Sequence, residues 1–217
     1  KGGKVQGPVV YDPNQATFDS EAGQVVANNP DAYVIIDYPD TYAKMGASLV
    51  RTGKFDAAKL FIPDALFFPT VPSNIAKQAI EGARVTAGGT PKGTDAAKLF
   101  EELWQKAGGA EHYSLDANSF DSTIICFLAA AAAKSAEPAA VTAKIRDVAA
   151  PGAKQYGVTN LGDALKAVTA GEKINYVGVA GAFDFGENGD PTISLFDIFE
   201  YKDGKLGEIF IDMHKEG

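Results

Sequence analysis

Short continuous apolar runs alternate with amphipathic segments in the first half of the chain. Tyr33-Val34-Ile35-Ile36 and Leu60-Phe61-Ile62 are uninterrupted apolar runs, and residues 43–50 between them repeat apolar side chains at helical spacing. Strands covered by helices on both faces have this pattern, because neither face needs polar residues. The sequence therefore predicts an α/β fold with a doubly wound, mainly parallel sheet.

The remaining patterns extend this reading along the chain. Thr94 is the expected cap of the helix that follows it. Three Ala-rich segments predict helices after residue 119, with Asp121 near the start of the first. Asp203-Gly204 predicts the turn of a hairpin because this dipeptide tolerates positive φ. The predicted strands are 5–11, 33–36, 60–62, 83–86, 193–201 and 206–211, and the predicted helices are 18–26, 43–53, 73–78, 94–107, 119–134, 139–148 and 161–170.

Composition excludes several classes of protein. The 217 residues carry a formal net charge of -8, and no basic cluster is present that would attract a phosphate backbone, so we expect no nucleic-acid partner. The single cysteine, Cys126, rules out an intrachain disulfide framework. The longest apolar stretch, residues 124–133, is about half the ~20 residues that a bilayer crossing needs. No apolar segment follows Lys1-Gly2-Gly3-Lys4, so no leader peptide is expected within these residues.

The motifs of enzymes and metal proteins are missing. His112 and His214 have no histidine or cysteine neighbour at metal-ligand spacing, and we expect no metal site. Cys126 lies among apolar residues and is expected to be a small buried hydrophobic residue. The stretches 88–93 and 178–181 lack the spacing of phosphate or dinucleotide loops and are read as turns, so no cofactor is expected. We therefore do not expect an enzyme.

Polar and aromatic residues follow two neighbouring predicted strands. Asp37, Tyr38 and Asp40 come after the first strand, and Asp64 and Phe67-Phe68 come after the second. Ligands of open α/β sheets bind beyond the carboxyl ends of the strands, so these residues predict one wall of a binding cleft. Each residue also has a structural alternative, since an aspartate can cap a helix and the phenylalanines can enter the core.

Several segments resemble type I periplasmic solute-binding proteins of ABC importers, in the branch that binds branched-chain amino acids, amides and urea. The start of the chain carries weaker matches, and its end, with Phe183-Asp184-Phe185-Gly186-Glu187-Asn188-Gly189-Asp190, is more specific. The matching segments are 9–18, 29–41, 170–178, 181–190 and 201–205.

This resemblance implies two lobes that close on a solute without covalent chemistry. It implies that residues 1–112 and 193–217 belong to the sheet of the second, C-terminal lobe and that residues 117–190 are the helical part of the first. Asp64 matches the position of a carboxylate that binds the ligand ammonium, and Tyr38 matches an aromatic residue of the same cleft. The implied partners are a small amino-acid-like, amide or urea-like solute and a membrane permease, and the implied location is periplasmic or extracellular, either soluble or lipid-anchored.

The resemblance also implies that most of the first lobe, and the first βα unit of the second, lie outside this sequence. A parallel sheet without an inner strand exposes backbone donors and an apolar face. We therefore expect a homodimer or an exchanged element. The leading functional hypothesis is a solute receptor for import, and the alternative is a sensory or regulatory ligand-binding module of the same fold.

Overall fold

The computed structural model describes residues 2–109, 112 and 115–215, with the backbone alone considered for residues 208–215. The chain divides into two compact units. The first comprises Lys1–Ala87 and Ile198–Phe210, and the second comprises Gly88–Asp197 and Ile211–Gly217. The assignment of chain segments to the two lobes of a solute receptor stays a prediction.

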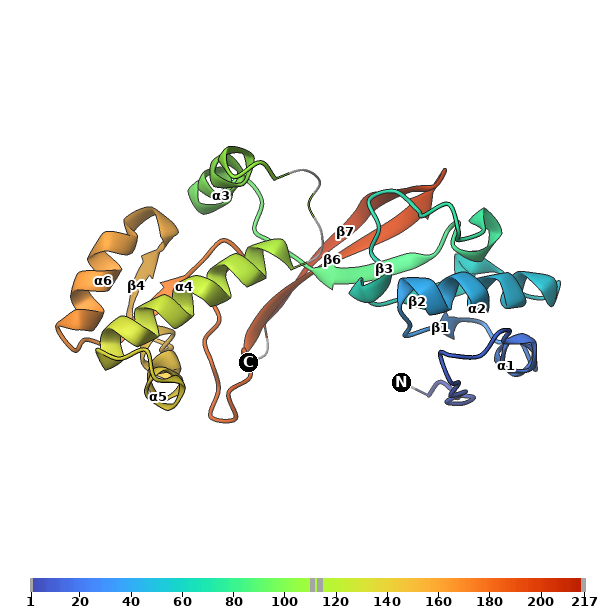
Figure 1. Ribbon diagram of the computed structural model, residues 1–217, viewed down its shortest axis with the longest axis horizontal. Helices are drawn as coiled ribbons and strands as arrows, with labels where there is room; N and C mark the ends of the chain where they lie inside the picture. Colours follow the sequence, from blue (N-terminus) through green and yellow to red (C-terminus); the bar gives the residue numbers. More distant parts are fainter. Residues whose placement is uncertain (1, 110–111, 113–114, 216–217) are drawn as a thin grey trace. The chain divides into compact units, whose positions relative to one another are not determined.

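A five-stranded mixed sheet runs through the first unit in the order β1-β2-β3-β6-β7 (Figure 1). Strands β1, β2 and β3 are parallel, as the uninterrupted apolar runs predict. The β6–β7 hairpin turns at Asp203 and Gly204, which both have positive φ. The strand bounds are β1 Tyr33–Val34, β2 Leu60–Ile62, β3 Arg84–Gly88, β6 Ile193–Lys202 and β7 Lys205–Lys215.

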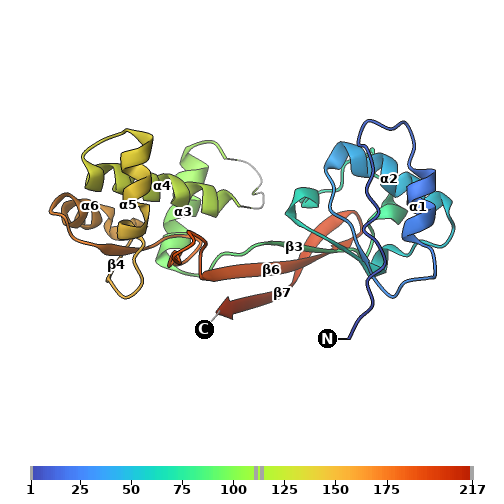
Figure 2. The same ribbon diagram turned by 90° about the horizontal axis from the view of Figure 1, so that it is seen from below.

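Helices α1 (Asp19–Val25) and α2 (Pro39–Arg51) pack on one face of this sheet (Figure 2). Tyr42 and Leu60 are fully buried in the core between them and the strands. Short 3-10 turns occur at Ala57–Lys59, Asp64–Leu66 and Lys77–Ala79.

The opposite face of the same strands is apolar and exposed. Val34 and Ile36 are 74% and 79% exposed, and Phe61, the register partner of Val34, is also exposed. Arg84 covers part of Phe61, with its guanidinium carbon 5.5 Å from the ring centre. Parallel sheets are ordinarily covered on both faces. Here, by contrast, β1 is the edge strand of the sheet and its second face is uncovered.

The second unit is mainly helical, with a small parallel sheet of two strands, β4 and β5. Leu128, Val168 and Tyr176 lie in its core. Its elements are α3 Asp95–Lys106, α4 Asp116–Ala133, α5 Pro138–Val148, β4 Lys154–Gly157, a 3-10 turn Val158–Asn160, α6 Leu161–Thr169 and β5 Ile174–Val177. Thr94 caps α3 as predicted, because its hydroxyl accepts a hydrogen bond from the Ala97 amide at 3.1 Å.

Three local predictions were wrong. Residues 5–11 form no strand. Residues 73–78 form no α-helix; they begin with turns and run into the 3-10 turn at Lys77–Ala79. Cys126 is exposed instead of buried. The buried side of α4 carries Asp121, Ile125 and Leu128, and a helix turns about 100° per residue, so Cys126 points away from it.

Over the described part of the chain, no single helix is long and apolar enough to cross a bilayer; α4 and α5 pass such a test only as a pair, which is bent by 107°.

Candidate functional site

The loops that follow β1 and β2 end at the same edge of the parallel sheet. Tyr33 of β1 is the register partner of Leu60 of β2. Asp37 and Asp64 each lie four residues beyond these partners (37 − 33 and 64 − 60), so the two loops leave the sheet at the same level. This topology places the predicted residues on one wall, at the strand ends where α/β proteins bind ligands.

Tyr38 is displayed at the surface of this wall. It is the N-cap residue of α2, with extended backbone, and its side chain is 74% exposed. The helix begins here because Pro39 fits the first helical turn, where no backbone N–H is needed. An exposed tyrosine has a ring face and a hydroxyl available for contact, and the role of Tyr38 in ligand binding stays a prediction.

Asp37 is buried beneath Tyr38 and holds the loop in place. It is 8% exposed, accepts a hydrogen bond from the Tyr11 hydroxyl at 2.8 Å, and accepts another from the Tyr38 amide at 2.7 Å. Burial raises the pKa of Asp37, and both hydrogen bonds oppose that rise. Burial and the bond to Asp37 also raise the pKa of Tyr11, so this phenol stays protonated and donates. Asp37 is therefore a structural residue of the loop.

Asp64 opens the 3-10 turn that follows β2, and its side chain is half-buried. Its backbone carbonyl accepts a hydrogen bond from the Phe67 amide at 3.0 Å. Within the part of the chain that the structure describes, its carboxylate has no hydrogen-bond or ion-pair partner. A carboxylate with free acceptor sites suits a ligand ammonium or amide N–H. Tyr38 and Asp64 share the wall but make no hydrogen bond with each other.

The structural alternatives hold for the neighbouring residues. Phe67 and Phe68 are half-buried and pack against the core of the first unit, with the Phe67 ring 5.0 Å from that of Phe199. Asp40 lies in the first turn of α2, where a negative charge favours the helix dipole.

No cluster of three or more metal-ligating side chains was found among the described residues. His112 lies between two carboxylates, with its ring nitrogens 2.8 Å from Glu101 and 3.3 Å from Asp116, and its ring stacks on Trp104. His112 and its two carboxylate partners are on or near the surface, so this cluster ties α3 to the start of α4.

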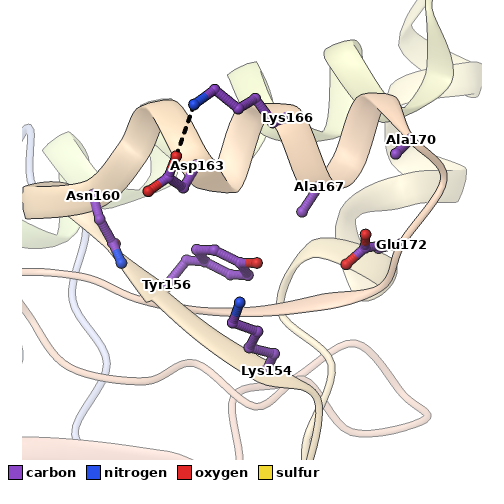
Figure 3. Close-up of a pocket in the computed structure, with 8 residues that line it drawn as sticks. All are labelled: Lys154, Tyr156, Asn160, Asp163, Lys166, Ala167, Ala170 and Glu172. Carbon is purple, nitrogen blue, oxygen red and sulfur yellow. Dashed lines mark hydrogen bonds and ion pairs between the residues drawn. The ribbon is translucent and has the colours of Figure 1, made fainter.

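A shallow depression of about 490 Å³ lies between α6 and β4 of the second unit, and none of the predicted site residues lines it (Figure 3). Three of its four charged side chains have partners: Lys166 binds Asp163 at 2.9 Å, and the Lys154 ammonium lies over the Tyr156 ring. We read it as a solvated surface.

Asp121 is a buried carboxylate that the sequence patterns placed at a helix start. It lies within α4, is fully buried, and accepts three hydrogen bonds, from the Tyr176 hydroxyl at 2.9 Å, the Val179 amide at 3.0 Å and the Ala180 amide at 2.7 Å. Gly178 packs against the carboxylate so closely that a Cβ there would overlap it. Asp121 thus fixes the segment after β5, and its position on the buried side of α4 was the signal that the sequence offered.

The chain was compared with known families and structures. The profile of a family described as periplasmic binding protein matches residues 1–202. A search of curated proteins found no match.

Three solved structures share the fold at low sequence identity. A leucine-binding protein LivK from Thermotoga maritima has 20% identity and a TM-score of 0.64, covering 91% of this chain and 49% of its own. LivJ from Streptococcus pneumoniae, in complex with isoleucine, has 14% identity and a TM-score of 0.61, covering 93% and 50%. An ABC transporter solute-binding protein from R. palustris, in complex with benzoate, has 13% identity and a TM-score of 0.56, covering 94% and 49%.

The chain spans about half the length of these structures. The fold is that of type I periplasmic binding proteins, a mixed α/β architecture with a mainly parallel sheet. Because the family profile covers nearly the whole sequence, the chain belongs to the periplasmic binding protein family.

Proposed function

We propose that the protein is the substrate-binding component of an ABC importer and that the Tyr38–Asp64 wall binds an amino-acid-like or amide solute. The observation that carries this proposal is the half-buried Asp64 carboxylate, which has no partner within the described residues. Among the described residues, its oxygens are not counted with the buried unpartnered atoms, so they are open to solvent and free to accept hydrogen bonds from a ligand. The family membership supports a binding role, and it points to a location outside the cytoplasmic membrane.

Each residue of the wall has a distinct part in the proposed site. Asp64 accepts hydrogen bonds from an ammonium or amide nitrogen, and the exposed Tyr38 ring lies along the apolar or cationic part of the solute. The proposed partner after binding is a membrane permease. We also propose that the first unit corresponds to the second lobe of the family and the second unit to the helical part of the first lobe.

Replacement of Asp64 tests the proposal. Isothermal titration of the intact protein with L-leucine, acetamide and urea identifies the tightest-binding probe, and Asp64→Ala is expected to weaken it about 10- to 100-fold, since a hydrogen bond to a charged group contributes about 1.5–3 kcal/mol. Asp64→Asn is expected to weaken an ammonium-bearing probe more than an uncharged amide.

Asp31→Ala is the matched control. Asp31 is an exposed aspartate at the amino-terminal end of β1, whereas Asp64 follows the carboxyl end of β2. Its replacement is expected to leave affinity unchanged. Equal affinities of wild type and Asp64→Ala for all three probes would contradict the proposal.

We further propose that a protein consisting of residues 1–217 alone forms a homodimer or exchanges an element along β1. The exposed Val34 and Ile36 and the unpaired edge of β1 support this. Light scattering is expected to show a dimer that Val34→Lys with Ile36→Lys converts to a monomer. A compact wild-type monomer would contradict it.

A further inference from the structure

The loop from Asp64 to Phe68 has little internal structure to hold it. Two backbone hydrogen bonds form its short turn, from the Leu66 amide to the Pro63 carbonyl at 3.2 Å and from the Phe67 amide to the Asp64 carbonyl at 3.0 Å. The turn has no side-chain cap. These two bonds do not use the Leu66 carbonyl or the Phe68 amide, so another element has to bind the far end of the loop.

The hydroxyl of Tyr201 supplies that fixing. It donates a hydrogen bond to the Leu66 carbonyl at 2.6 Å and accepts one from the Phe68 amide at 2.8 Å. One side-chain atom thus satisfies two backbone groups of the loop, one as donor and one as acceptor. The side chain of Leu66, the residue whose carbonyl accepts the first of these bonds, is fully buried.

Tyr201 is itself held firmly by the sheet. It lies on β6, is 1% exposed, and its backbone exchanges hydrogen bonds with Gly82 at 2.8 Å and Ala83 at 3.0 Å. Burial raises the pKa of its phenol, so the hydroxyl keeps the proton that it donates. A second contact joins the same strand to the same loop, the edge-on packing of Phe67 on Phe199.

We propose that Tyr201 is a positioning residue for ligand binding, which holds the Asp64 loop in its binding geometry through the double hydrogen bond of its hydroxyl. Tyr201 does not touch the solute and acts through Asp64. This inference rests on the proposed function of the Tyr38–Asp64 wall. Ordering a loop on binding costs free energy, and a loop that is already fixed avoids this cost. The hydroxyl therefore raises the affinity for the ligand by preorganisation.

Tyr201→Phe removes the hydroxyl and keeps the ring. Tyr42→Phe is the matched control, because Tyr42 is also fully buried in the first unit and its hydroxyl donates to the backbone carbonyl of Ala79 at 2.5 Å, a residue outside the Asp64–Phe68 loop. Both variants lose one buried hydroxyl, so a general loss of stability affects both.

The assay is titration of the intact protein with the tightest-binding of L-leucine, acetamide and urea. We expect Tyr201→Phe to weaken binding about tenfold and Tyr42→Phe to stay within about twofold of wild type. Amide hydrogen exchange at Phe68 is expected to accelerate in Tyr201→Phe only. In the Asp64→Ala background, adding Tyr201→Phe is expected to cause no further loss, because residues that act as one unit are not additive.

Two results separate the positioning role from the proposed function. If Asp64→Ala weakens binding but Tyr201→Phe behaves like Tyr42→Phe, the positioning role is overturned and the proposed function stands. If Tyr201→Phe weakens binding equally with and without Asp64, it does not act through Asp64, and the inference is also overturned. Unchanged binding in Asp64→Ala removes both.

Discussion

Replacing Asp121 by alanine tests how much the second unit depends on one buried carboxylate. Asp121 accepts hydrogen bonds from one hydroxyl and two amides, and its donors Tyr176 and Val179 are buried. Alanine removes all three acceptor sites at once. The segment after β5 then loses its attachment to α4.

The size of the effect follows from the donors left behind. A buried donor without a partner costs about 1–3 kcal/mol. The cavity left by the carboxylate can admit water, so we take the lower end for each of the three donors, about 3 kcal/mol in total. Burial raises the pKa of Asp121, which means that its charge is itself unfavourable in the fold, and its removal offsets part of this loss. We expect a net destabilisation of about 2–3 kcal/mol.

Urea denaturation followed by the fluorescence of Trp104 measures this change. Trp104 is the only tryptophan in the chain and lies in α3 of the second unit, so its signal reports on the correct part. Asp163→Ala on α6 is the control, since Asp163 is exposed and its loss is expected to leave the stability nearly unchanged. If Asp121→Ala destabilises the unit no more than Asp163→Ala does, the reasoning about the buried acceptor is refuted.

Three further substitutions have defined outcomes. Asp37→Asn is expected to stabilise the protein slightly near neutral pH. The pKa of Asp37 is raised in the fold, so the stability that its protonated form contributes is complete below the ordinary pKa of 3.8 and is lost as pH rises through the raised pKa. The thermal unfolding temperature of the variant should therefore depend less on pH over this window. Leu60→Ala should cost about 2–5 kcal/mol in denaturant unfolding followed by circular dichroism, because Leu60 is fully buried in the sheet core. Asp147→Asn should lower the free energy of unfolding by less than about 1 kcal/mol in the same assay, because it removes ion pairs with two lysines near the surface. These ion pairs lower the pKa of Asp147, so the difference from wild type should be present above pH 3.8 and shrink as pH falls through the lowered pKa.

The parts of the fold that sequence patterns predicted are those set by neighbouring residues. The run Leu60–Ile62 is a strand, Thr94 caps a helix, and Asp203 with Gly204 forms the hairpin turn. The strand depends on a local apolar pattern, the cap on an amide three residues away, and the turn on residues that tolerate positive φ. All three can be read from adjacent residues in the sequence.

The parts that were missed depend on partners distant in the sequence. Strands β4 and β5 have polar residues such as Lys154, Gln155 and Asn175, and only their mutual pairing makes them strands. The segment at residues 5–11 has strand-like composition but gains no ladder of hydrogen bonds. Of the site, the loop positions of Tyr38 and Asp64 follow from the strand order, whereas the bond of Asp37 to Tyr11 depends on packing.

The double hydrogen bond of Tyr201 also determines when the loop after β2 can become ordered during synthesis. Its two partners, Leu66 and Phe68, precede it by 135 and 133 residues. A ribosome adds about 5–20 residues per second, so the nascent loop waits several seconds for the strand that fixes it. A chain that stops before β6 would retain both predicted binding residues and would lack this attachment. Loss of the attachment would by itself lower the affinity for the ligand.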